Sequence, residues 1–76
     1  MKLKLIETII REFPDRSFSY QIWNLDDVKV LSLTDNLGNP PVVKSAADEA
    51  IQIVSDWLME FGPTYLRDGE EHDVAI

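Results

Sequence analysis

The sequence contains no cysteine, which excludes disulfide bonds, thiolate catalysis and cysteine-ligated zinc. Its three glycines, Gly38, Gly62 and Gly69, are too few and too far apart to form a phosphate-binding loop. The single histidine, His72, has no nucleophile beside it in a catalytic motif. We therefore expect a protein that is not an enzyme and that has no cofactor and no metal.

Long apolar runs are also missing, so the sequence predicts neither a membrane span nor a secretion signal. A small secreted domain without disulfides would be unusual, and we therefore predict a cytoplasmic location. With 76 residues the chain has room for one domain with a small core. A large buried catalytic cavity is not expected.

Basic residues are scarce in the C-terminal part of the chain. Residues 1–44 hold six Lys and Arg against six Asp and Glu, whereas residues 45–76 hold only Arg67 against eight acids. The whole net charge of -7 thus lies in residues 45–76. A field of this sign repels phosphate backbones and attracts basic surfaces, so direct nucleic-acid binding is disfavoured.

The N-terminal segment fits two kinds of secondary structure. Ile6, Ile9, Ile10 and Phe13 follow the i, i+3, i+4, i+7 spacing of an amphipathic helix, with Pro14 as its stop. Residues 2–5 alternate between polar and apolar side chains as in a strand. We predict a helix here, with a strand as the alternative.

The middle of the chain predicts a β-hairpin. Residues 18–23 alternate, residues 28–34 are β-branched and apolar, and residues 24–27 between them are typical of a turn. Residues 40–43 are a candidate third strand, confined to a sheet edge because proline lacks the N–H donor.

The clearest element is a helix that ends at Gly62 and Pro63. Ser45 and Asp48 have the spacing of a capping box. The residues that follow form an unbroken apolar stripe, namely Ala50, Ile53, Val54, Trp57, Leu58 and Phe61.

Together these elements predict a small single α+β domain of order α-β-β-(β)-α. An antiparallel meander of two to three strands would pack against two helices, which leaves the other sheet face open. We place the domain at residues 1–63 and an acidic, solvated C-terminal tail at residues 64–76.

This order of elements resembles that of the double-stranded RNA-binding domain. That family has a lysine cluster at the start of its second helix and a loop containing Gly, Pro and His. Here residues 44–49 read Lys-Ser-Ala-Ala-Asp-Glu, and no histidine lies in the corresponding loop. The resemblance is one of layout, and the charge is opposite.

The polar side of the second helix carries acids and no Lys or Arg between residues 45 and 61. Residues 49, 52, 56 and 60 fall in one line along the helix, and the three carboxylates of this line can imitate phosphates and fill a basic groove. A merely solubilising surface is the alternative. The candidate partner-binding residues on this side are Asp48, Glu49, Gln52, Asp56 and Glu60.

Two aromatic residues complete the candidate binding surface. If helices cover one face of the sheet, either Tyr20 or Trp23 faces away from the core, because neighbouring strand residues point to opposite faces. Exposed Tyr and Trp are common interface anchors. Membership of the core, or packing at a strand edge, is the alternative for both.

The sequence-based hypothesis is a small non-enzymatic inhibitor or regulator. Its acidic C-terminal half would dock on a basic surface of a larger, nucleic-acid-handling protein, and its composition resembles that of phage-type inhibitors of host defence. The alternative is an assembly subunit that oligomerises, for example as a homodimer, through the open sheet face and a strand edge. Metal binding by residues 70–73 is not expected, because a flexible tail lacks preorganised geometry.

Overall fold

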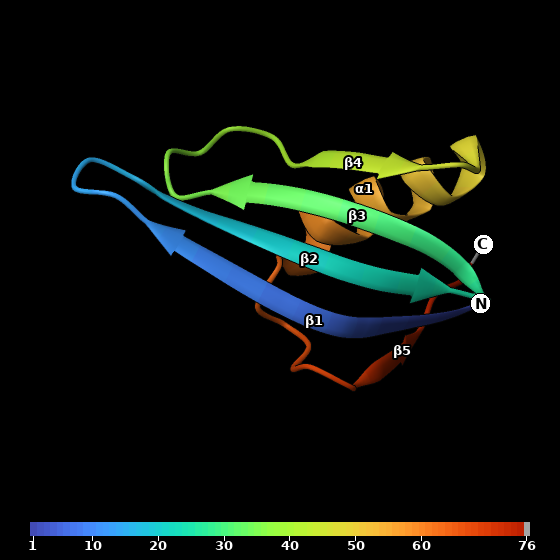
Figure 1. Ribbon diagram of the computed structural model, residues 1–76. Helices are drawn as coiled ribbons and strands as arrows, with labels where there is room; N and C mark the ends of the chain where they lie inside the picture. Colours follow the sequence, from blue (N-terminus) through green and yellow to red (C-terminus); the bar gives the residue numbers. More distant parts are fainter. Residues whose placement is uncertain (76) are drawn as a thin grey trace.

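The structure is a computed structural model that describes residues 1–75. These residues form a five-stranded antiparallel sheet with one helix on one of its faces (Figure 1). The strands lie in the order β4-β3-β2-β1-β5. This architecture confirms a small single α+β domain with an antiparallel sheet. The elements are β1 (Lys2–Glu12), β2 (Ser17–Leu25), β3 (Val28–Asp35), β4 (Val42–Ser45), α1 (Asp48–Phe61) and β5 (Glu71–Asp73).

The predicted N-terminal helix is wrong, because this segment forms β1, the longest strand. Leu3 and Leu5 alternate onto the core face and are fully buried. A β-bulge between Leu5 and Glu7 then shifts the alternation by one residue. Ile6 and Ile10, which the helical pattern would bury, are 46% and 60% exposed. Their spacing therefore did not reflect a buried stripe.

The hairpin of β2 and β3 is confirmed. The turn residues Asp26 and Asp27 both have positive φ, 46° and 69°, as a two-residue hairpin turn of the primed type requires. The side chain of Asn24 accepts a hydrogen bond from the backbone N–H of Asp27 at 2.7 Å. Turn chemistry recognised in the sequence thus fixes the register of these two strands.

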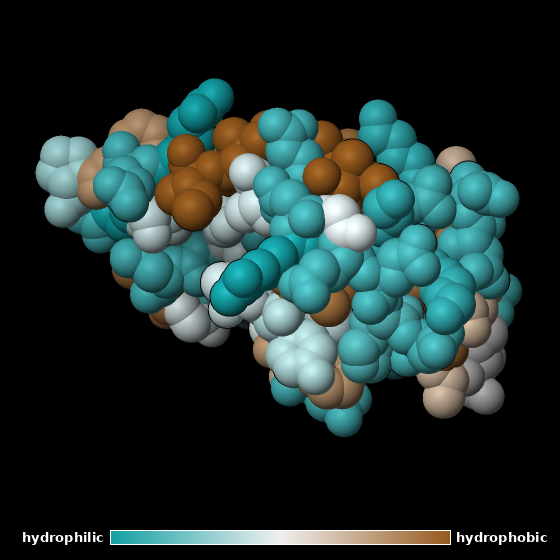
Figure 2. All heavy atoms as spheres, turned by 90° about the horizontal axis from the view of Figure 1, so that it is seen from below, coloured by the Kyte–Doolittle hydropathy of each residue, from teal (hydrophilic) through white to brown (hydrophobic). Residues whose placement is uncertain are grey.

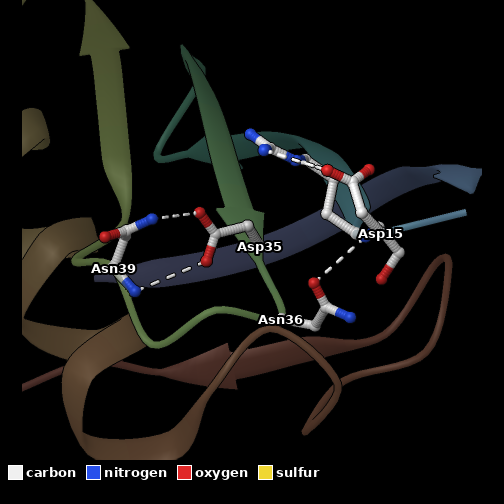
Figure 3. A network of polar contacts seen from close by, with 6 residues as sticks. Asp15, Asp35, Asn36 and Asn39 are labelled. Carbon is white, nitrogen blue, oxygen red and sulfur yellow. Dashed lines mark hydrogen bonds and ion pairs between the residues drawn. The ribbon is translucent and has the colours of Figure 1, made fainter. Parts of the chain in front are cut away.

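The loop between β3 and β4 is held by its own polar side chains (Figure 3). The amide nitrogen of Asn39 donates to Asp35 Oδ2 at 2.7 Å, and Asn36 Oδ1 accepts from the backbone of Ser17 at 3.0 Å. The hydrogen bond from the Asn39 side chain is the main cause that lowers the pKa of Asp35. The candidate edge strand at residues 40–43 is confirmed in part, because an edge strand, β4, forms but begins at Val42, after both prolines.

Helix α1 lies where the apolar stripe predicts it, but the capping box does not form. Ala47 is the N-cap, and no side chain caps the first turn. Ser45 Oγ instead donates to the carbonyl oxygen of Lys29 at 2.8 Å, across the β3–β4 pair. At the other end Gly62 adopts a φ of 84° and its N–H donates to the carbonyl oxygen of Leu58.

The core lies between the sheet and α1. The two indole rings of Trp23 and Trp57 meet edge to face with centroids 5.4 Å apart. Trp23 Nε1 donates to Ser32 Oγ at 2.8 Å, and that hydroxyl donates to the side chain of the buried Gln21. The buried apolar residues are Leu3, Leu5, Trp23, Leu25, Val30, Ala50, Val54, Trp57, Leu58 and Leu66.

The segment predicted as an acidic tail contributes to this domain. Leu66 is 8% exposed and belongs to the core. The strand β5 pairs antiparallel with the start of β1, and Leu3 stands opposite His72. Up to Val74, which exchanges backbone hydrogen bonds with Met1, the chain therefore folds onto the sheet, and Ile76 lies outside the described residues.

Candidate functional site

The acidic side of α1 faces solvent along its whole length. All five residues named for it in the sequence, Asp48, Glu49, Gln52, Asp56 and Glu60, are exposed. Gln52 Nε2 donates to Asp56 Oδ1 at 2.9 Å, which restrains this carboxylate at an i, i+4 spacing. Between residues 1 and 75 neither Asp56 nor Glu60 takes part in a salt bridge.

A hollow of about 530 Å³ opens between the C-terminal half of α1 and β5. Its lining combines aromatic and apolar side chains with carboxylates from both elements. The hollow thus joins part of the acidic helix surface to the C-terminal strand. It is lined by Ile53, Asp56, Trp57, Glu60, Phe61, His72, Asp73, Val74 and Ala75.

The three rings that line this hollow, Trp57, Phe61 and His72, pack together with Tyr65 in a cluster of four rings. The Trp57 centroid lies 5.1 Å from that of Phe61 and 5.8 Å from that of His72. Tyr65, which precedes the buried Leu66, stacks on Phe61 at 4.9 Å. Trp57 Nε1 donates to His72 Nδ1 at 3.4 Å and thereby connects α1 to β5. Phe61 and Tyr65 remain 36% and 54% exposed, so ring surface is open to solvent.

The carboxylates around the hollow differ in their partners. Asp73 Oδ1 lies 2.9 Å from Lys2 Nζ. The hydrogen bond from Lys2, followed by its charge, lowers the pKa of Asp73, and the same contact raises the pKa of Lys2. Asp73 is therefore balanced by a cation, whereas Asp56 and Glu60 present their negative charge to the hollow without one.

This arrangement of groups suits a cationic side chain. A guanidinium or ammonium group can lie against the face of an aromatic ring, which attracts it electrostatically, while carboxylates accept its hydrogen bonds. Both components are present here, with Phe61 supplying exposed ring surface and Asp56 and Glu60 supplying oxygens.

The two aromatic residues predicted as interface anchors have different positions. Trp23 is 1% exposed, and its indole N–H is used inside the core, so it offers no surface to a partner and its assignment to a binding site is withdrawn. Tyr20 lies on the opposite face, which α1 does not cover, and is 43% exposed. The physical reason is strand alternation: Trp23 follows Leu5 and Val30 onto the helix side.

Sequence reasoning missed Phe61, Tyr65 and His72 as site residues. Phe61 was placed in the core stripe, and the other two were placed in the tail. The i, i+4 spacing of Trp57 and Phe61 was visible, but nothing in the sequence indicated that β5 returns to them. No three His, Asp or Glu side chains within residues 1–75 lie close enough to hold a metal ion.

Comparison of the chain with protein-family models, with curated proteins and with solved structures found no significant match. Over the described part of the chain, α1 is too short and too polar to cross a membrane.

Proposed function

We propose that this protein is a non-enzymatic binding protein that docks on a basic surface of a larger protein. The single observation that supports this function best is the aromatic hollow beside the carboxylates of Asp56 and Glu60, which form no salt bridge within residues 1–75. An arginine or lysine side chain of the partner would enter the hollow, and the remaining acids of α1 would contact neighbouring basic residues.

The charge of α1 supports a partner that handles nucleic acid. Asp56 and Glu60 stand four residues apart on the same side of the helix, and α1 contains no Lys or Arg. Such a one-sided surface is slightly unfavourable for an isolated helix, because like charges repel and no i, i+4 ion pair offsets them. A basic groove that otherwise binds phosphates would compensate this charge, and occupation of the groove would inhibit or regulate the partner.

The test is calorimetric titration with a blocked peptide of alternating arginine and glycine, at low and at physiological ionic strength. We expect D56N/E60Q to weaken binding about tenfold, because two charge-assisted contacts are lost. The matched control is D27N/D68N, which removes the same charge at turns away from the hollow. Equal weakening in both variants would mean that net charge alone attracts the peptide, and the site would be rejected.

A second candidate function, self-assembly, is favoured by the uncovered face of the sheet. Tyr20, Leu31 and Val42 on this face are 43%, 44% and 52% exposed. In Figure 2, seen from the edge formed by β1 and β5, apolar side chains gather along the upper side, away from α1. Assembly through apolar burial would persist at high salt, whereas docking led by charge would weaken.

A further inference from the structure

We propose that the free edge of β1 pairs with the same edge of a second copy of this chain. The pairing is antiparallel and centred on Ile9, and it joins two five-stranded sheets into one. This inference rests on the second candidate function, self-assembly, and names both the partner and the register.

The edge itself follows from the sheet topology. On one side β1 pairs with β2 from Leu3 to Glu12, but on the other side β5 pairs only with residues 2–4. The last contact on that side is at Leu5, which exchanges backbone hydrogen bonds with Gly69 and Glu70. From Glu7 to Glu12 no strand of the described chain lies beside β1 on the side opposite β2, as Figure 1 shows near the arrowhead of β1.

The backbone groups that point outward can be assigned from the hairpin turn. Phe13 and Arg16 exchange both of their backbone hydrogen bonds and so form a hydrogen-bonded pair of β1 with β2. Because such pairs alternate along an antiparallel ladder, residues 7, 9 and 11 bond toward β2. The N–H and C=O groups of Thr8, Ile10 and Glu12 therefore point outward and are available to another strand.

The side chains along this edge are self-complementary in one register. When Ile9 faces Ile9 of the second copy, Glu7 faces Arg11 of that copy, and by symmetry the opposite pair forms as well. These are non-hydrogen-bonded positions, where the two strands approach most closely and cross-strand side chains interact best. Thr8 and Ile10 then pair through their outward backbone groups, so the side chains and the backbone select the same register.

Neighbouring registers lack this match. A shift of one residue places Glu7 opposite Glu12 of the second copy, where like charges repel. It also places residues whose backbone groups bond toward β2 opposite residues whose backbone groups point outward, so the hydrogen bonds between the two copies cannot form. A shift of two residues centres the pair on Ile10 and leaves Arg11 facing Ile9. Charged residues on an edge usually prevent self-pairing, whereas here their spacing converts repulsion into two ion pairs.

The segment between α1 and β5 leaves space in the plane of the sheet for a second strand beside β1. After α1 the chain runs on the helix side, where Pro63 and Thr64 line a shallow hollow together with Ile10 and Ser19. It reaches the plane of the sheet only near Gly69, beside Leu5. Ile10 is 60% exposed, and pairing would cover part of this apolar surface.

The test uses charge variants and sedimentation velocity on the complete chain. We expect the wild type to sediment with twice its mass of 8.7 kDa at high concentration, and E7R and R11E each to sediment as monomers. In a dimer of either variant, residue 7 of each copy would face a like charge at residue 11 of the other copy. In a mixed dimer of the two variants, both pairs have opposite charges again. The mixture should therefore recover the dimer, which also shows that each variant is folded.

A crosslink tests the register independently. Because the chain has no cysteine, I9C introduces a single thiol, and the close approach expected at this pair suits a disulfide. We expect I9C to form a disulfide-linked dimer on mild oxidation, several-fold faster than I10C, whose counterpart is Thr8. A dimer that neither responds to charge variants nor crosslinks through I9C would overturn this register but leave self-assembly standing. A wild type that stays monomeric at every concentration would overturn both.

Discussion

The indole nitrogen of Trp57 donates a hydrogen bond to Nδ1 of His72 at 3.4 Å. This contact joins the C-terminal half of α1 to β5, two elements that are separated along the chain by residues 62–70. It also orients both rings, which line the acidic hollow. The shape of the candidate site therefore depends on the docking of β5.

Substitution H72F tests this connection, because it keeps a ring in the cluster and removes the acceptor. We expect the Trp57 indole proton to move upfield in the NMR spectrum and to exchange faster with water, since its hydrogen bond is lost. The Trp23 indole proton, bonded to Ser32, is the internal control. An unchanged Trp57 signal would show that the bond to His72 does not form in solution.

The role of residues 64–75 in stability is tested by L66A. Leu66 is 8% exposed in the core, so truncation should lower the free energy of unfolding by about 2–3 kcal/mol through lost burial and a cavity. The control L37A makes the same change at a loop residue that is 53% exposed, and its effect should stay within about 0.5 kcal/mol. If L66A and L37A both lower the free energy of unfolding only slightly in chemical denaturation, residues 64–75 do not contribute to the core.

Local chemistry explains which elements were predictable. Asn24 to Asp27 specify a turn, and the apolar stripe from Ala50 to Phe61 specifies a helix, so both were predicted correctly. The first segment was not, because a bulge after Leu5 breaks the period-two pattern that identifies a strand. Pairing of β5 depends on contacts between the two ends of the chain, and these have no local signature.

The same distinction holds for the candidate site. The acids of α1 were recognised because they share one helix, and a helical period places them on one side. Trp23 was a candidate for the binding surface because the alternation of a strand shows which residues share a face, but not which face is buried. The aromatic part of the hollow forms because β5 places His72 beside Trp57. This contact depends on the tertiary structure and is not visible in the sequence.

The ion pair of Lys2 and Asp73 predicts a specific pH dependence. Because the folded pKa of Asp73 is lowered from 3.8, the contribution of this group to stability is present above its unfolded pKa and is lost as pH falls through the folded pKa. Substitution K2Q should raise the Asp73 pKa in an NMR titration of the side-chain carboxyls. The Asp35 pKa, lowered mainly by Asn39, should not change and is the internal reference. An unaltered Asp73 titration in K2Q would show that the pair is absent in solution.

The most direct test of the acidic hollow as a binding site is an NMR titration of the two indole protons with the arginine and glycine peptide. Trp57 lines the hollow, whereas Trp23 is bonded to Ser32 in the core. We predict that the Trp57 signal moves in a saturable manner, that the Trp23 signal moves far less, and that D56N/E60Q abolishes the shift. Saturable binding that leaves the Trp57 signal in place would contradict the proposed site.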